Sequence, residues 1–93
     1  MGIPKKGSRS LEVDGKKYRY LIKETHIPDH RDQKELIVTV QEDTPKPGRV
    51  LQFKETYGFP VTKGHVGEAI REAIKIGWNP SERGVPFPLA TEG

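Results

Sequence analysis

The chain has no cysteine and only one tryptophan and one methionine, and hydrophobic residues make up 32% of its 93 residues. Without cysteine it forms no disulfide bond and offers no thiolate as a nucleophile or metal ligand. No apolar run approaches the length of about 20 residues that a membrane-spanning helix needs. Residues 1–9 are basic but lack the apolar segment of a secretory signal. These absences predict a cytoplasmic protein with one small core.

Basic residues are concentrated in the first quarter of the chain. Residues 1–23 hold seven lysines and arginines against two acidic residues, although the net charge of the whole chain is only +3. A basic segment can steer an anionic partner toward a protein, but an excess of this size is also ordinary on a solvated surface. The solvated surface is the simpler interpretation.

A β-hairpin is predicted close to the N-terminus. Asp14-Gly15 is a signal for a two-residue type I′ turn, and apolar residues alternate with polar ones on both sides of it. The resulting register places Val13 opposite Lys16 and Leu11 opposite Tyr18. Because side chains alternate between the two faces of a strand, the apolar residues of both strands then share one face.

Two further strands are predicted in the middle of the chain. A third is expected at Glu35–Gln41 and a fourth at Arg49–Glu55, separated by the turn residues of 43–48. Residues 24–34 contain Pro28 and a polar cluster, which predicts a loop longer than most hairpin connections.

A helix between Val61 and Trp78 has the strongest local signals. Thr62 is a suitable N-cap, Val61 and Val66 can form a hydrophobic staple, and Gly77 is a suitable left-handed stop. Helical spacing gathers one apolar stripe, formed by Val66, Ala69, Ile70, Ala73 and Ile74. Trp78 is expected to pack back onto the last turn of this helix.

These elements predict an α+β fold of two layers, in which a four-stranded, mainly antiparallel sheet (β-β-β-β-α) packs one face against one C-terminal helix. Residues 1–8 are predicted to be a flexible arm and 9–93 a single domain. The tail, in which Phe87 and Leu89 alternate with Pro86 and Pro88, can dock as an extended strap at a sheet edge at most. The predicted core comprises Leu11, Val13, Tyr18, Tyr20, Ile22, Leu36, Val38, Val40, Leu51, Phe53, Val66, Ala69, Ile70, Ala73, Ile74 and Trp78.

Two blocks of the sequence resemble a family of small uncharacterised bacterial proteins. The first block is Gly7-Ser8-Arg9 with Val13-Asp14-Gly15 and Tyr18-Arg19-Tyr20, and the second extends from Val61 through Gly77-Trp78-Asn79-Pro80 to Gly84-Val85-Pro86-Phe87-Pro88-Leu89. The family has no assigned activity. The resemblance therefore implies a self-contained domain whose C-terminal strap belongs to the fold, and it supplies no functional residue.

Residues 24–34 are a candidate metal site, because they hold two histidines and several carboxylates: Glu24, His26, Asp29, His30 and Asp32. Histidines four positions apart share a face only on a helix, and the intervening Pro28 disfavours a helix. A solvated loop is therefore preferred, and we expect neither a metal nor another cofactor. Zinc is expected to leave the ring resonances of His26 and His30 unchanged in a titration followed by NMR.

The start of the helix is a second candidate, because free backbone N–H groups beside Lys63 and His65 can attract an anion. Every exposed helix start has this property, and the glycines here do not form a phosphate-binding loop. Catalysis is the least favoured function, since Ser8, Ser10 and Ser81 lack a nucleophile motif and no paired-carboxylate site is visible. We therefore predict that the chain is not an enzyme.

The favoured function is a protein-interaction module that uses the face of the sheet turned away from the helix. Alternation places interleaved basic and apolar residues there, and the candidate surface comprises Lys17, Arg19, Leu21, Lys23, Ile37 and Val50. Its occupant would be a protein partner or a second copy of the chain. Isolated aliphatic residues on a sheet surface are also normal, which is the simpler interpretation.

Nucleic-acid binding is the alternative for the same face. Lys17, Arg19 and Lys23 could contact phosphates together with basic residues of the N-terminal arm. Both tyrosines of the second strand are predicted to point inward, so the exposed stacking aromatics of single-strand binders are missing. We expect no interaction with a membrane.

Overall fold

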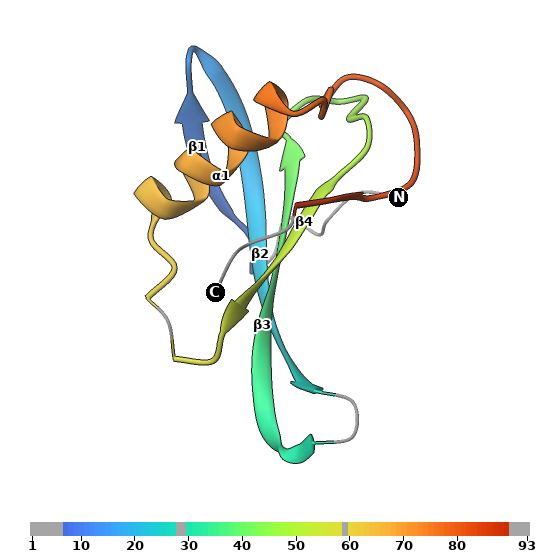
Figure 1. Cartoon of the computed structure of the whole chain (residues 1–93). Coiled ribbons are helices and arrows are strands. Elements are labelled where there is room, and N and C mark those ends of the chain that lie inside the picture. Colours follow the sequence, from blue (N-terminus) through green and yellow to red (C-terminus); the bar gives the residue numbers. More distant parts are fainter. Residues whose placement is uncertain (1–6, 28–29, 59, 90–93) are drawn as a thin grey trace.

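The computed structural model describes residues 7–27, 30–58 and 60–89. One helix, α1 (Lys63–Lys75), accompanies a five-stranded sheet in the order β1-β2-β3-β4-β5 (Figure 1). The strands are β1 (Arg9–Val13), β2 (Lys16–Ile27), β3 (His30–Glu42), β4 (Leu51–Thr56) and β5 (Phe87–Pro88). The predicted α+β class with one helix is confirmed, whereas the predicted four strands become five.

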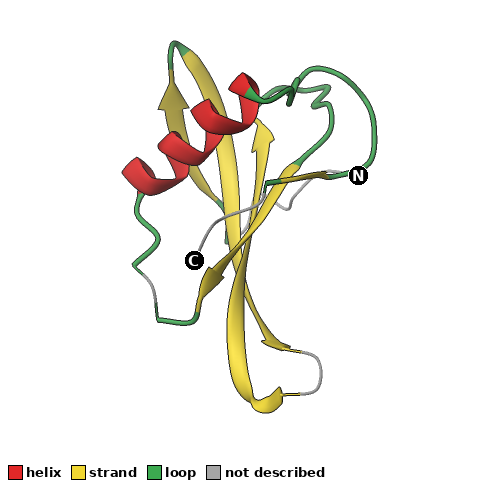
Figure 2. Ribbon diagram, in the orientation of Figure 1, coloured by secondary structure: helices red, strands yellow, loops and turns green. Residues whose placement is uncertain are grey.

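The helix lies across one face of the sheet, and the core fills the space between these two layers (Figure 2). Val38, Val40, Leu51, Val66, Ile70 and Ala73 are completely inaccessible to solvent. The predicted core is correct at most positions, and Leu89 of the tail joins it. Two predicted core residues are wrong, since Ile22 is 37% and Ile74 43% exposed.

Ile22 and Ile74 each lie where a strand or the helix ends, so that the neighbouring layer no longer covers them. Tyr20 pairs with Arg9, the first residue of β1, so Ile22 lies beyond the end of β1 and only β3 flanks it. Ile74 belongs to the last turn of α1 and lines an open pocket instead of packing in the core. Hydrophobic period alone does not report where the opposite layer stops.

The predicted N-terminal hairpin is confirmed in its register. Val13 pairs with Lys16 and Leu11 with Tyr18, and Asp14 and Gly15 both have the positive φ angles that a type I′ turn requires. The two tyrosines of β2 are at most 2% exposed. One face of this hairpin is therefore the sheet side of the core.

The predicted loop at residues 24–34 is wrong. Strand β2 continues to Ile27 and β3 begins at His30, and Glu24, Thr25 and His26 pair with residues of β3. Strand β1 does not reach this part of the hairpin and β4 pairs with β3 only as far as Glu35, so beyond the Thr25–Glu35 pair the hairpin extends as a two-stranded ribbon (Figure 1). Glu24, His26, Gln33 and Lys34 are exposed, so these positions show no alternation of apolar and polar residues.

The tail adds the fifth strand, and this confirms the predicted docking at an edge. Strand β5 runs parallel to β4, with N–H groups of Phe87 and Leu89 donating to the carbonyls of Val50 (2.8 Å) and Gln52 (3.0 Å). In a parallel strand only alternate N–H groups face one neighbour, so Pro86 and Pro88 occupy the positions that need no donor. Proline thus permits the edge position and excludes a further strand beyond it.

The ends of α1 form as the sequence predicts. The Thr62 hydroxyl accepts a hydrogen bond from the N–H of His65 at 3.2 Å. At the other end Gly77 has φ of +123°, and the Trp78 N–H donates to the carbonyl of Ala73 at 2.8 Å. With the 3.2 Å bond from Gly77 to Ile74, these are the two bonds of a Schellman motif. Trp78 is thereby directed back toward the sheet and is 2% exposed.

Gly67, inside α1, offers a stabilising substitution. A methyl group at this position would lie 3.6 Å from a Val13 methyl, which is an ordinary contact. Alanine also loses less backbone entropy than glycine in a helix interior. We expect Gly67→Ala to raise the free energy of unfolding by about 0.5–1 kcal/mol. Urea denaturation measures the change, and a decrease would show that the helix leaves no room for a methyl group beside Val13.

Candidate functional site

The face of the sheet opposite α1, called the outer face below, is built by the alternate residues of β2, β3 and β4. Leu21 pairs with Thr39, and Lys23 pairs with Ile37. Leu21 and Ile37 are therefore diagonal neighbours on adjacent strands, a position from which large side chains reach each other. Both are half-buried, although the described residues place no helix on this side of the sheet.

The outer face is closed at one end by polar contacts. The guanidinium of Arg19 lies 3.5 Å from the Asp43 carboxylate, and one of its terminal nitrogens donates to the Ser8 hydroxyl at 3.2 Å. Gln41, which pairs with Arg19, is only 6% exposed. This end therefore consists of groups that already bind one another. Residues 1–6 of the predicted arm lie outside the described residues.

The cations of the outer face differ in whether they form an ion pair with a neighbouring carboxylate. Lys54 lies 3.5 Å from the Glu35 carboxylate, and Arg19 is held by Asp43. Lys17 and Lys23 are exposed and form no ion pair within the part of the chain that the structure describes. Two cations on different rungs give little charge for a phosphate backbone, which is recognised by many simultaneous contacts.

The structure brings together only part of the predicted surface. Leu21, Lys23 and Ile37 are neighbours, and Lys17 lies four residues before Leu21 along β2. Val50 precedes β4 and is not a strand residue, which corrects the predicted start of the fourth strand at Arg49. Ile37 pairs with Lys54, so Val50 is four residues farther along the chain, roughly 13 Å at the rise of a strand. Val50 is thus not part of the apolar centre.

The structure also locates the histidines, the helix start and the serines that the sequence offered as candidate sites. The paired strands β2 and β3 carry His26 and His30, and no group of three metal-binding side chains occurs among the residues described. At the start of α1 the His65 ring lies 3.1 Å from the Glu55 carboxylate, which is 11% exposed. The Glu55 carboxylate would repel an anion at the start of α1. Ser81 donates to Glu42 at 3.4 Å, and Ser8 accepts from Arg19.

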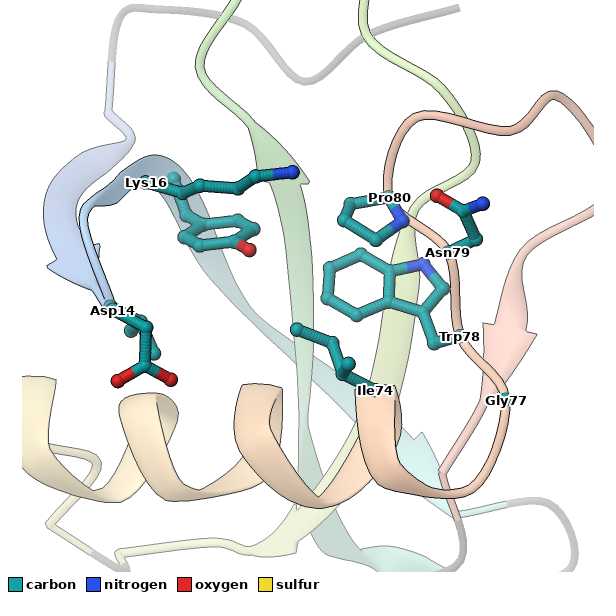
Figure 3. A pocket seen from close by; sticks show the side chains of 9 residues that line it. Asp14, Lys16, Ile74, Gly77, Trp78, Asn79 and Pro80 are labelled. Atoms are coloured by element: carbon teal, nitrogen blue, oxygen red, sulfur yellow. The ribbon is translucent and has the colours of Figure 1, made fainter.

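A pocket that the sequence analysis did not anticipate lies on the helix side of the sheet (Figure 3). It has a volume of about 570 Å³ and is bounded by the β1–β2 turn, the last turn of α1 and residues 77–80. Tyr18 and Trp78 belong to its lining, with their ring centroids 6.1 Å apart. Ligand pockets commonly have volumes of this size. No sequence signal indicated it, since Ile74 was expected to be a core residue.

Tyr18 has an unusual environment in this pocket. Burial raises the pKa of its phenol above the ordinary value of 10.0, and the nearby carboxylates of Glu42 and Asp14 raise it further. The neutral phenol is therefore favoured in the folded protein. Tyr18 keeps its proton throughout the physiological pH range and can donate a hydrogen bond.

This environment predicts an alkaline loss of stability. Since the folded pKa is the higher one, the stability contributed by Tyr18 is complete below about pH 10 and is lost as pH rises toward the folded pKa. We expect the wild-type chain to lose stability in this range and Tyr18→Phe to lose less. Urea denaturation at pH 8 to 11 measures this, with Tyr20→Phe as the matched control. Equal pH dependence in wild type and Tyr18→Phe would contradict the assignment.

Comparison with models of known protein families, with curated proteins and with solved structures finds no match to this chain. The resemblance to small bacterial proteins therefore stays a prediction. None of the helices in the described residues is long and apolar enough to cross a membrane.

Proposed function

We propose that the chain is a small, non-enzymatic interaction module that binds a protein partner through the outer face. The observation that carries the proposal is the pair Leu21 and Ile37, diagonal neighbours at the centre of a sheet face that no described helix covers. Apolar side chains at the centre of a polar surface are typical of protein interfaces. Lys23 borders this centre, and Lys17 lies four residues from Leu21 along the same strand.

The chemistry of the outer face defines the partner. Leu21 and Ile37 require apolar side chains opposite them, and the two exposed lysines favour carboxylates at the edge of the contact. Cations at an edge mainly raise the association rate, whereas the apolar centre determines the dissociation rate. The affinity is therefore expected to depend on Leu21 and Ile37 and to respond weakly to salt.

Nucleic-acid binding is the competing hypothesis, and it has less support. Its central residue, Arg19, is held by Asp43 and Ser8, and Lys54 is held by Glu35. A phosphate would have to displace these partners before it could bind. The tyrosines of β2 are buried, so they offer no stacking surface for bases.

An affinity capture from a nuclease-treated lysate, combined with a duplex DNA titration, tests the proposal. We expect a captured protein to be retained between about 50 and 200 mM salt and to be lost with Leu21→Ser and Ile37→Ser. Ile76→Ser is the control, because Ile76 is 54% exposed but lies at the end of α1. Circular dichroism verifies that each variant is folded.

Two results would contradict the proposal. The first is capture that persists in Leu21→Ser and Ile37→Ser. The second is micromolar DNA binding that weakens steeply with salt and is lost in Arg19→Ala, which would support the competing hypothesis.

A further inference from the structure

Strand β1 is an outer strand of the sheet, and β2 is its one neighbour among the described strands. Val13 and Lys16 flank the two-residue turn, so these two residues exchange both of their backbone hydrogen bonds. Bonded pairs alternate along an antiparallel ladder. The N–H and C=O groups of Ser10 and Glu12 therefore point away from β2, and both residues are exposed. These four backbone groups are a template for one more strand.

A groove of about 360 Å³ lies beside this edge, between β1 and the first half of α1. Gly64 and Gly67 line the groove, and because glycine has no side chain they leave room beneath the helix. A methyl group added at Gly64 would meet only the Thr62 hydroxyl, at 3.8 Å. In Figure 1, α1 crosses β1 and its first turn lies outside the edge. An added strand would thus place every second side chain in the groove.

The helix advances along the groove in the same direction as β1. A methyl group at Gly67 would lie 3.6 Å from Val13, and farther along both elements Arg71 is paired with Asp14 at 3.5 Å. The helix residues that precede Gly67 therefore lie toward the start of β1. Glu12 also borders the groove, but alternation directs its side chain to the other face of β1.

Two charged side chains of the groove remain, and they lie at opposite ends. Lys63 lies at the Leu11 end and Glu68 at the Val13 end, and neither forms an ion pair within the described ranges. Glu55, whose carboxylate would repel an anion at the helix start, does not line the groove. A carboxylate is therefore favoured opposite Leu11, and a cation opposite Val13.

The occupant of this edge must be an extended chain, because only an extended backbone matches the spacing of the free groups. Strand β1 has five residues, about 17 Å at the rise of a strand, which suits a short peptide. A second copy of the chain would bring its own α1 to an edge where a helix already lies, and a stable dimer needs about 1,200–2,000 Å² of contact. Antiparallel addition is favoured because it is slightly more stable per residue than parallel addition.

We propose that β1 binds a short extended peptide segment of a partner protein by antiparallel strand addition, with a basic residue opposite Val13 and an acidic residue opposite Leu11. Along the peptide the basic residue comes first, and the acidic residue follows two positions later. The residue between them exchanges hydrogen bonds with Glu12, and the residue after the acidic one exchanges them with Ser10. Backbone pairing supplies the affinity, and the two charges set the register.

The probe is the peptide Lys-Val-Glu-Val-Thr, capped at both ends, and its control is Glu-Val-Lys-Val-Thr, which has the same composition with the two charges exchanged. We expect the probe to shift the amide resonances of Ser10 and Glu12 in a saturable way at about 0.1–1 mM. The control should bind about three- to tenfold more weakly at low salt. Hydrogen exchange at these two amides should slow on binding, whereas the amides of Leu11 and Val13 are protected without the probe.

Variants on both sides of the contact test the backbone pairing. Ser10→Pro removes the N–H that points away from β2, a position at which an edge strand tolerates proline, and should weaken the probe at least about threefold. Ser10→Ala keeps this N–H and should bind as wild type does. An N-methyl group on the fourth residue of the probe should weaken binding by a similar factor. The same group on the third residue, whose N–H points away from β1, should leave the affinity unchanged.

Four results would overturn the inference. The first three are the absence of saturable shifts at Ser10 and Glu12, equal binding of the two peptides at low salt, and equal effects of the N-methyl group at the third and fourth residues. The fourth is protection of these amides in the free protein that rises with protein concentration, which would show that a second copy occupies the edge. Leu21 and Ile37 lie on β2 and β3, so failure of this test leaves the proposed interaction through the outer face unaffected.

Discussion

Replacing Ile70 with alanine is expected to lower the free energy of unfolding by about 2–5 kcal/mol. Ile70 is completely buried between α1 and the sheet, so its truncation leaves a cavity in addition to the lost burial of apolar surface. A domain of this size is stable by only about 5–15 kcal/mol. Urea denaturation followed by circular dichroism measures the loss.

Ile74→Ala is the matched control for Ile70→Ala, because both isoleucines lie on α1 and only Ile70 is buried. The exposed Ile74 loses less burial, and alanine is the better helix former, so a change below about 1 kcal/mol is expected. Equal effects of the two substitutions would place the apolar stripe outside the core.

Gly48→Ala is expected to detach the tail from the sheet and to cost about 1–3 kcal/mol. A methyl group at this position would clash with the backbone oxygens of Pro80 and Glu82, the latter at 2.6 Å. The N–H of Gly48 donates to Pro80 at 3.1 Å and that of Arg49 to Glu82 at 2.7 Å, so the close approach is fixed by hydrogen bonds. Backbone cannot move aside as a flexible side chain can.

Limited proteolysis, with urea denaturation, tests the effect of Gly48→Ala. The tail should be cleaved faster than in wild type, since β5 depends on the adjoining contacts. Gly84→Ala is the control, because its methyl would meet only the side chain of Arg49 at 3.5 Å. Equal cleavage of wild type and Gly48→Ala would show that the tail is held independently of this contact.

Local signals predicted the parts of the fold in which neighbouring residues determine the structure. Asp14-Gly15 fixed both the turn and the register of the first hairpin, and Thr62 and Gly77 marked the two ends of the helix. Alternate prolines in the tail indicated an edge position, and β5 occupies one. These features depend on φ angles and backbone donors, which residue types restrict directly.

Features that depend on distant parts of the chain could not be predicted. Within residues 24–34 the exposed positions Glu24, His26, Gln33 and Lys34 are polar, so the apolar alternation that reveals a strand is missing. The pocket requires the β1–β2 turn and the Trp78–Pro80 segment to meet, and only the folded chain shows this. The ion pair between Arg19 of β2 and Asp43, which follows β3, likewise cannot be predicted from hydrophobic periodicity or turn residues.

Site-specific photo-crosslinking in living cells tests the outer face as a protein-binding surface most directly. A benzoylphenylalanine residue is placed at position 37 in one variant and at position 68, an exposed site on α1, in another. The account predicts a discrete protein adduct from position 37 that is absent from position 68 and that disappears when Leu21→Ser is added. No protein adduct from position 37, or the same adducts from both positions, would contradict it.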